Sequence, residues 1–258
     1  MNDQPAFRRA LRIAAGVIVV VVMAATVRDL ARDSNPTIEG SNPDLGTPSP
    51  TAPSQSRDPS APLLIDLIVS DADVGPSLTV AGMQGGNGLS QPTLDLCNGT
   101  YPSEERRTAR LQVRAVDNLG DTALSTEAVL YTSGADTANA FTELRRTAEN
   151  CPSGPVDSPV GLPTVTTRFR PAPDADWPQV PPQVERLAFA FDSIDNSGDS
   201  THSVAVYLRR GRALLGVYFS HADAPTAVVE GKTALGDIVN IFAARLAKLP
   251  LAAISTTA

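Results

Sequence analysis

Apolar and polar residues alternate along several short segments after residue 100, which is the period of a β-strand with one buried face. The clearest case is residues 110–116, where Leu111, Val113 and Ala115 predict one face and the arginines and glutamine between them predict the other. Further segments are rich in aromatic and β-branched residues, and turn residues separate them. The predicted strands are residues 110–116, 123–132, 164–170, 184–194, 203–210 and 213–220, with a tight turn at residues 209–212.

Other segments repeat their apolar residues at the spacing of an amphipathic helix. In residues 135–150, Phe141 and Leu144 lie on one face, and in residues 227–249 Ile238 and Phe242 do the same. A shorter helix is predicted to begin near residue 63 and to end before Asp71. Runs of strands with one middle and one terminal helix predict an α+β domain, in which the helices pack on one face of an antiparallel sheet.

Residues 13–27 form an uncharged apolar run that follows three arginines within residues 1–12. A run of about 15–18 residues fits both a short membrane-spanning helix and the apolar part of a cleaved signal peptide. No good small-x-small cleavage site follows the run before Arg28, which favours an uncleaved transmembrane anchor over residues 13–30. The positive-inside rule then predicts a cytoplasmic N-terminus and an extracellular C-terminal part. A cleaved signal peptide is the alternative.

Residues 31–62 are predicted to be a linker, because residues 34–62 contain seven prolines and six serines and too few apolar side chains to form a core. Residues 63–258 have the length of a domain. All of the net charge of −7 belongs to this part, which argues against a nucleic-acid partner. With two histidines and two cysteines in the whole chain, we expect no metal and no cofactor.

The two cysteines are Cys97 and Cys151. Outside the membrane the compartment is oxidising, so the expected state is a disulfide that closes a loop of about 55 residues. A chain-entropy argument puts its contribution near 4 kcal/mol. The alternatives are a free thiol and an intermolecular bridge. The prediction depends on the predicted topology.

Two local patterns resemble ligand sites but lack essential positions. Gly231-Lys232-Thr233 matches the end of a phosphate-binding loop, but the pattern needs a glycine where Thr226 stands. Residues 192–199 contain three aspartates, but a calcium loop starting at Asp195 would need a glycine where Ser200 stands. We therefore expect Gly231-Lys232-Thr233 to begin the last helix. We expect residues 192–199 to form a turn between two strands.

Two further patterns have both a chemical and a structural interpretation. Ser200 and His202 resemble part of a hydrolase triad, with His221 as the other base, but no G-x-S-x-G sequence is present. We therefore expect the histidines at strand ends, facing solvent. The glycine-rich residues 82–88 predict a mobile loop, with close backbone contact to a ligand as the alternative.

Residues 95–104, with the sequence DLCNGTYPSE, together with Arg107, Arg110 and Gln112, resemble a group of actinobacterial membrane-anchored or exported proteins. Phe141, Cys151-Pro152 and residues 204–211 fit the same group. The group is similar to the extracellular sensor domain of PknH-type serine/threonine kinases. The resemblance covers residues 63–250 discontinuously, and it implies an α+β domain with a cleft, outside the membrane, that senses or binds an unidentified ligand.

The chain departs from that group in two respects. The kinase-linked domains usually have two disulfides, whereas this chain can form one, and it lacks the kinase signatures. We therefore expect a non-catalytic, membrane-anchored sensor-like protein of the cell envelope, which binds a small or lipidic ligand between sheet and helices and signals through a partner. The alternatives are a module that docks another envelope protein and a serine hydrolase.

Overall fold

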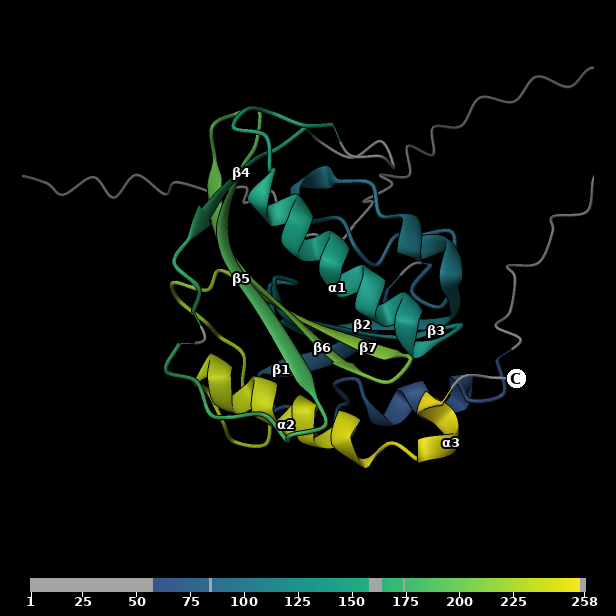
Figure 1. Ribbon diagram of the computed structural model, residues 1–258. Helices are drawn as coiled ribbons and strands as arrows, with labels where there is room; N and C mark the ends of the chain where they lie inside the picture. The colour runs from purple at the N-terminus through teal and green to yellow at the C-terminus, as the bar shows by residue number, and fades with distance from the viewer. Residues whose placement is uncertain (1–57, 84, 158–163, 174, 256–258) are drawn as a thin grey trace, which may run out of the picture.

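The computed structural model describes residues 58–83, 85–157, 164–173 and 175–255 (Figure 1). The predicted cytoplasmic segment and membrane anchor lie outside these ranges, as does the linker up to residue 57. Among the described residues, no helix has the length and apolar character that crossing a membrane requires.

The described chain folds around one seven-stranded sheet in which every neighbouring pair of strands is antiparallel. This confirms the predicted α+β class and the antiparallel sheet. The strands are β1 (Leu78–Gly82), β2 (Arg107–Asp117), β3 (Thr122–Tyr131), β4 (Thr166–Arg170), β5 (Glu185–Ile194), β6 (Ser200–Arg210) and β7 (Ala213–Ser220), in the order β1-β2-β3-β7-β6-β5-β4. The helices are α1 (Gly134–Glu149), α2 (Leu235–Lys248) and α3 (Leu251–Ile254), with short 3₁₀ turns η1 (Ala61–Asp66), η2 (Leu96–Asn98) and η3 (Pro102–Arg106).

The prediction that the helices pack on one face of the sheet is wrong. In Figure 1, α1 lies across one face of the sheet, and α2 lies across the other. Two separate cores correspond to these faces, one containing Phe141 of α1 and the other containing Phe242 of α2. The central strands β3 and β7 are buried along their whole length, so both of their faces need a cover. The amphipathic pattern of a helix identifies its apolar side but not the face of the sheet that it covers.

The ends of several elements differ from their predicted positions. The last helix begins at Leu235 rather than near residue 227, because Val229 and Lys232 pair in a turn that carries the chain to it. The first predicted helix is a 3₁₀ turn that begins at Ala61. Strand β1 was not predicted, and in the structure only Leu78 of its five residues is buried.

The domain includes residues that the sequence assigns to the linker. Asp58 pairs with Arg212, which lies in the turn from β6 to β7 and has a completely buried side chain. Arg212 also donates to the carbonyl oxygens of Ala253 and Tyr131. Burial raises the pKa of Asp58, but hydrogen bonds from Arg212, Thr108 and the backbone of Ser60 more than offset this and lower it to about 2. Asp58, the first described residue, is therefore linked through Arg212 to α3.

The predicted tight turn at residues 209–212 is confirmed. Gly211 has a φ of +55°, and a Cβ at this position would lie 2.3 Å from the carbonyl oxygen of Ile254. Only glycine combines this backbone conformation with so close an approach of α3.

Candidate functional site

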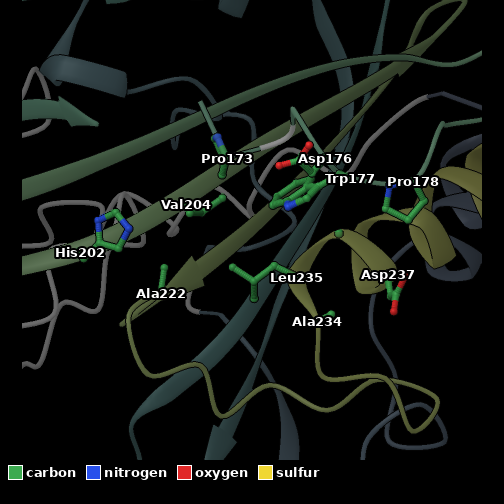
Figure 2. Close-up of a pocket in the computed structure, with 11 residues that line it drawn as sticks. Pro173, Asp176, Trp177, Pro178, His202, Val204, Ala222, Ala234, Leu235 and Asp237 are labelled. Atoms are coloured by element: carbon green, nitrogen blue, oxygen red, sulfur yellow. The ribbon is translucent and has the colours of Figure 1, made fainter. Parts of the chain in front are cut away.

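A pocket of about 480 Å³ lies between the sheet, the beginning of α2, Pro173 and residues 176–178 (Figure 2). Val204 of β6 and Leu235 of α2 supply apolar surface, and Trp177 lies between Pro173 and Pro178. In Figure 2, His202 lies at the left edge of the pocket, and Asp176 lies beside Trp177. The volume and the mixture of apolar and polar groups are those of a site for a small organic molecule.

Trp177 is held in place by its contacts on two elements. A Cβ on Gly236 would lie 2.7 Å from the Cγ atom of Trp177, so the absence of a side chain in the first turn of α2 makes room for the ring. The guanidinium group of Arg186 lies 5.6 Å from the ring centroid and donates to the carbonyl oxygen of Pro178 at 2.8 Å. The ring of Trp177 is therefore held in position before any ligand enters the pocket.

His202 belongs to an ionic network on the other side of the pocket. Its Nδ1 atom lies 3.2 Å from Oδ1 of Asp192, and its Nε2 atom lies 3.9 Å from Oδ1 of Asp223. Arg170 pairs with both carboxylates, at 2.8 and 3.2 Å. Burial raises the pKa of Asp192, but Arg170 and His202 outweigh it and give a net lowering. His202 therefore has fixed partners and is half-buried within β6, contrary to the prediction that it faces solvent at a strand end.

The hydrolase arrangement is not assembled in the described residues. Ser200 is exposed at the beginning of β6, and no hydroxyl or thiol forms a hydrogen bond with His202 among the side chains that the structure describes. His221 is exposed just after β7. An Asp192–His202 pair without an adjacent nucleophile can orient a polar ligand group, but it lacks the attacking atom of a triad.

A second group of polar residues lies inside the domain, on the α1 side of the sheet. Arg110 of β2 and Glu127 of β3 form a buried ion pair, with 3% and 2% of their side chains exposed. Thr93 donates to Glu127 at 2.7 Å, and Arg107 pairs with Glu104 at 3.1 Å. We call these five residues, together with Asp95, Tyr207 and Tyr218, the polar interior. The hydroxyl of Tyr218 lies 3.4 Å from Glu127, and Gly216 leaves the space in which the ring of Tyr218 lies.

Buried polar atoms without a hydrogen-bond partner are concentrated on this same side. The alternation of side chains along the strands places the side chains concerned on the α1 face, together with the core that contains Phe141. Among the described residues these atoms are Asp95 Oδ1, Arg114 Nε, Tyr131 Oη, Ser203 Oγ, Tyr207 Oη and Ser220 Oγ. Each such atom costs stability and calls for an explanation.

Two carboxyl groups of the polar interior, those of Asp95 and Glu104, have raised pKa values. Burial of its carboxyl group raises the pKa of Asp95 well above its ordinary value, and the negative charges of Glu127 and Glu104 raise it further. Burial also raises the pKa of Glu104 to about 7, although Arg107 and the backbone amides of Thr93 and Leu94 favour its charged form.

The predicted cysteine pair is present as a disulfide. Cys97 in η2 and Cys151 after α1 have Cα atoms 5.8 Å apart. The bond ties the segment that carries Asp95 to the end of the helix above it. It therefore closes the polar interior on the side of α1.

The other sequence patterns occupy structural positions. The segment from Asp195 to Asp199 forms the predicted turn, with Gly198 at a φ of +87°. Gly231 lies in the turn before α2. No group of histidine, cysteine and acidic residues able to hold a metal ion is found in the described ranges.

Sequence reasoning missed the central residues of both sites. Trp177 is the one tryptophan of the chain, and its rarity was the available signal. Arg110 and Gln112 were recognised as one side of a strand, but not as buried. The nearby acidic residues Asp95 and Glu104 could have suggested ionic partners.

Comparisons with known proteins add one structural likeness. No protein-family profile matches the chain, and no curated protein matches it. A solved structure similar to it is the extracellular domain of PknH from Mycobacterium tuberculosis, with 11% sequence identity and a TM-score of 0.42. The match covers 74% of this chain and 96% of that one. The likeness is one of fold at low similarity, and it carries no argument about ligand, activity or origin.

Proposed function

We propose that this protein is a membrane-anchored, extracytoplasmic, non-catalytic protein that binds a small molecule in the Trp177 pocket. The observation that carries the proposal is the pocket of about 480 Å³, with a positioned aromatic ring on one side and the fixed His202 network on the other. A preformed concave site with few, oriented polar groups is the usual form of a small-molecule site.

Location outside the cytoplasm is supported by two features of the chain. The apolar run at residues 13–27 follows a cluster of arginines. The Cys97–Cys151 disulfide is the state expected in an oxidising compartment. The anchor and the orientation stay predictions.

The lining of the pocket indicates which ligand chemistry fits. Trp177 and Leu235 offer apolar surface to a ring or a short hydrocarbon group, while Asp176 accepts hydrogen bonds at the edge. The nearby carboxylates disfavour a ligand with several negative charges. We therefore propose an envelope-derived ligand with a ring or short apolar group and with hydroxyl or amine donors.

Trp177 provides the test, because it is the chain's one tryptophan and lines the pocket. The full 258-residue chain would be titrated with N-acetylglucosamine, a muropeptide and a short-chain phospholipid, while tryptophan emission and Tm are recorded. Binding in the pocket is expected to shift the emission and to raise Tm, since a ligand that binds the folded state stabilises it.

Paired variants make the test specific. Ala234→Leu adds bulk at the pocket lining, whereas Ala224→Leu adds the same bulk to an exposed position outside the pocket lining. Binding that is lost in Ala234→Leu and retained in Ala224→Leu supports the proposal. A panel that changes neither emission nor Tm, or a response equal in both variants, would remove its support.

The alternative of a docking module has less support. The large apolar side chains exposed in the described residues are Ile65, Leu119, Phe169 and Leu251. They are distributed over η1, the turn after β2, β4 and α3. This distribution does not favour one extended apolar surface for a partner.

A further inference from the structure

Residues 85–91 cross over β2 as a strap that is held by the polar interior rather than by apolar packing. Arg110 Nη1 donates to the carbonyl oxygen of Gly85 at 2.9 Å. Arg107 donates to the carbonyl oxygens of Leu89 and Gln91 at 2.8 and 2.7 Å. The glycine-rich sequence thus brings its carbonyl groups onto two buried cations of its own chain.

One backbone contact fixes the position of the strap. The amide of Gln112 donates to the carbonyl oxygen of Gly86 at 2.9 Å. A Cβ on Gly86 would lie 2.7 Å from the carbonyl oxygen of Gln112, so the strap can lie this close only with glycine at position 86. The strap is therefore held on β2 by hydrogen bonds from Arg107, Arg110 and Gln112, which can break and form again without loss of an apolar core.

The charge balance beneath the strap depends on Asp95. Arg107 and Arg110 are balanced by Glu104 and Glu127 when both carboxylates are charged. Asp95 is the third carboxyl group, and its Oδ1 atom is buried without a hydrogen-bond partner. A charged Asp95 would add a third negative charge to two positive ones, at a buried position where its Oδ1 atom has no hydrogen-bond donor.

We propose that residues 85–91 form a pH-sensitive strap, which stays closed while Asp95 is protonated and opens when Asp95 and Glu104 become charged. Opening lets water reach the polar interior, where the carboxylates and the hydroxyl of Tyr207 gain partners. The strap does not line the Trp177 pocket, so this device is independent of the proposed function.

The direction of the pH dependence follows from the proton affinities. In the closed state burial raises the pKa of both carboxyl groups, to about 7 for Glu104, whereas solvent returns them toward ordinary values in the open state. The closed state therefore binds protons more tightly, and its stability relative to the open state is full in acid and falls as pH rises through the raised pKa values.

The groups that face Asp95 and Glu104 come from every neighbouring element. Two arginines act against the effect, while the carboxylates and phenols enclose the pair. They are Arg107 and Arg110 of β2, Glu127 and Tyr131 of β3, Tyr101 before η3, Tyr207 of β6 and Tyr218 of β7, and Glu143 of α1 faces Tyr101 behind them.

Hydrogen exchange followed by mass spectrometry tests the strap on the full chain. Amide protection factors of peptides covering residues 85–95 would be measured from pH 5 to pH 8, with correction for the pH dependence of exchange chemistry itself. Where opening releases one proton, protection is expected to fall by up to about tenfold per pH unit. Peptides from β7 and α2 serve as internal references and should keep their protection.

Variants separate the strap from general stability. Asp95→Asn is expected to abolish most of the pH dependence and to keep residues 85–95 protected at pH 8. Asp66→Asn, at an exposed position of η1, is expected to retain the wild-type profile. If Asp95→Asn fails to fold, Glu104→Gln is the second variant, with a smaller pH dependence expected.

Two results would overturn the proposal. One is equal protection of residues 85–95 at pH 5 and pH 8 in the folded wild-type chain. The other is a pH dependence that persists unchanged in Asp95→Asn or in Glu104→Gln. Ligand titration of the Trp177 pocket gives a separate readout, so failure of one proposal leaves the other to its own test.

Discussion

The two faces of the sheet bury different kinds of side chains. The α2 face is closed by an apolar core in which Ile238, Phe242 and Leu246 of the helix are fully buried. The α1 face also has an apolar core, around Phe141 and Leu144, but beside it lie an ion pair, further carboxyl groups and several phenols. All the unpartnered buried side-chain atoms that the structure describes belong to this second face.

The difference indicates a division of roles. Apolar burial stabilises a fold without demanding exact partners, whereas each buried polar group must be satisfied or it destabilises the fold. The apolar core of the α2 face therefore stabilises the domain without needing exact polar partners. The α1 face tolerates unfavourable groups, and buried titratable groups that are retained despite their cost are typical of functional regions.

The largest expected effect comes from breaking the ion pair of the α1 face. Glu127→Leu leaves Arg110 charged and buried, so we expect a loss of about 3–5 kcal/mol in the free energy of unfolding. Adding Arg110→Met should restore most of it, because a buried pair can be replaced by apolar residues at little net cost. Denaturant unfolding measures both variants, and a double variant no better than the single one would contradict this interpretation.

Removal of the disulfide should have the second largest effect on the free energy of unfolding. Replacing both Cys97 and Cys151 by serine is expected to lower the free energy of unfolding by about 2–4 kcal/mol. Because the bond joins η2 to the end of α1, hydrogen exchange should increase first in residues 93–104 and not in α2. Uniform loss of protection over both faces would show that the bond acts on the whole domain instead.

A smaller effect is expected from removing one methylene on the α2 face. Ile238→Val should cost about 1 kcal/mol, since it leaves a small cavity in a fully buried core. The cost should be the same at pH 5 and pH 8, because Ile238 is fully buried among apolar side chains of this core. A cost that changes with pH would weaken the contrast between the faces.

The smallest effect distinguishes two phenols of the polar interior. Tyr207→Phe removes a hydroxyl that has no partner, so stability should stay unchanged or rise by up to about 1 kcal/mol. Tyr218→Phe removes a hydroxyl that faces Glu127, so it should cost about 1 kcal/mol. Thermal unfolding of the two variants measures the difference. If Tyr207→Phe were the less stable variant, Tyr207 would have an unrecognised partner.

Local patterns were enough to predict most elements of the sheet and the middle helix. The alternation at Leu111, Val113 and Ala115 indicated a strand, and the spacing of Phe141 and Leu144 indicated a helix, because side-chain period reports directly on backbone conformation. The turn at Gly211 and the pairing of Cys97 with Cys151 were also predictable. The ion pair of Asp58 with Arg212 was not predictable, since a single aspartate in a proline-rich segment gives no sign of a distant partner.

The sequence by itself determined the periods, the turns, the cysteine pair and the apolar run at the N-terminus, all of which depend on neighbouring residues or on composition. Only the tertiary structure decided which helix covers which face, because both faces of the central strands are buried. It also decided that Arg110 is buried beneath a glycine-rich strap and that Trp177 meets Gly236. These are contacts between segments far apart in the chain, and local residue patterns carry no record of them.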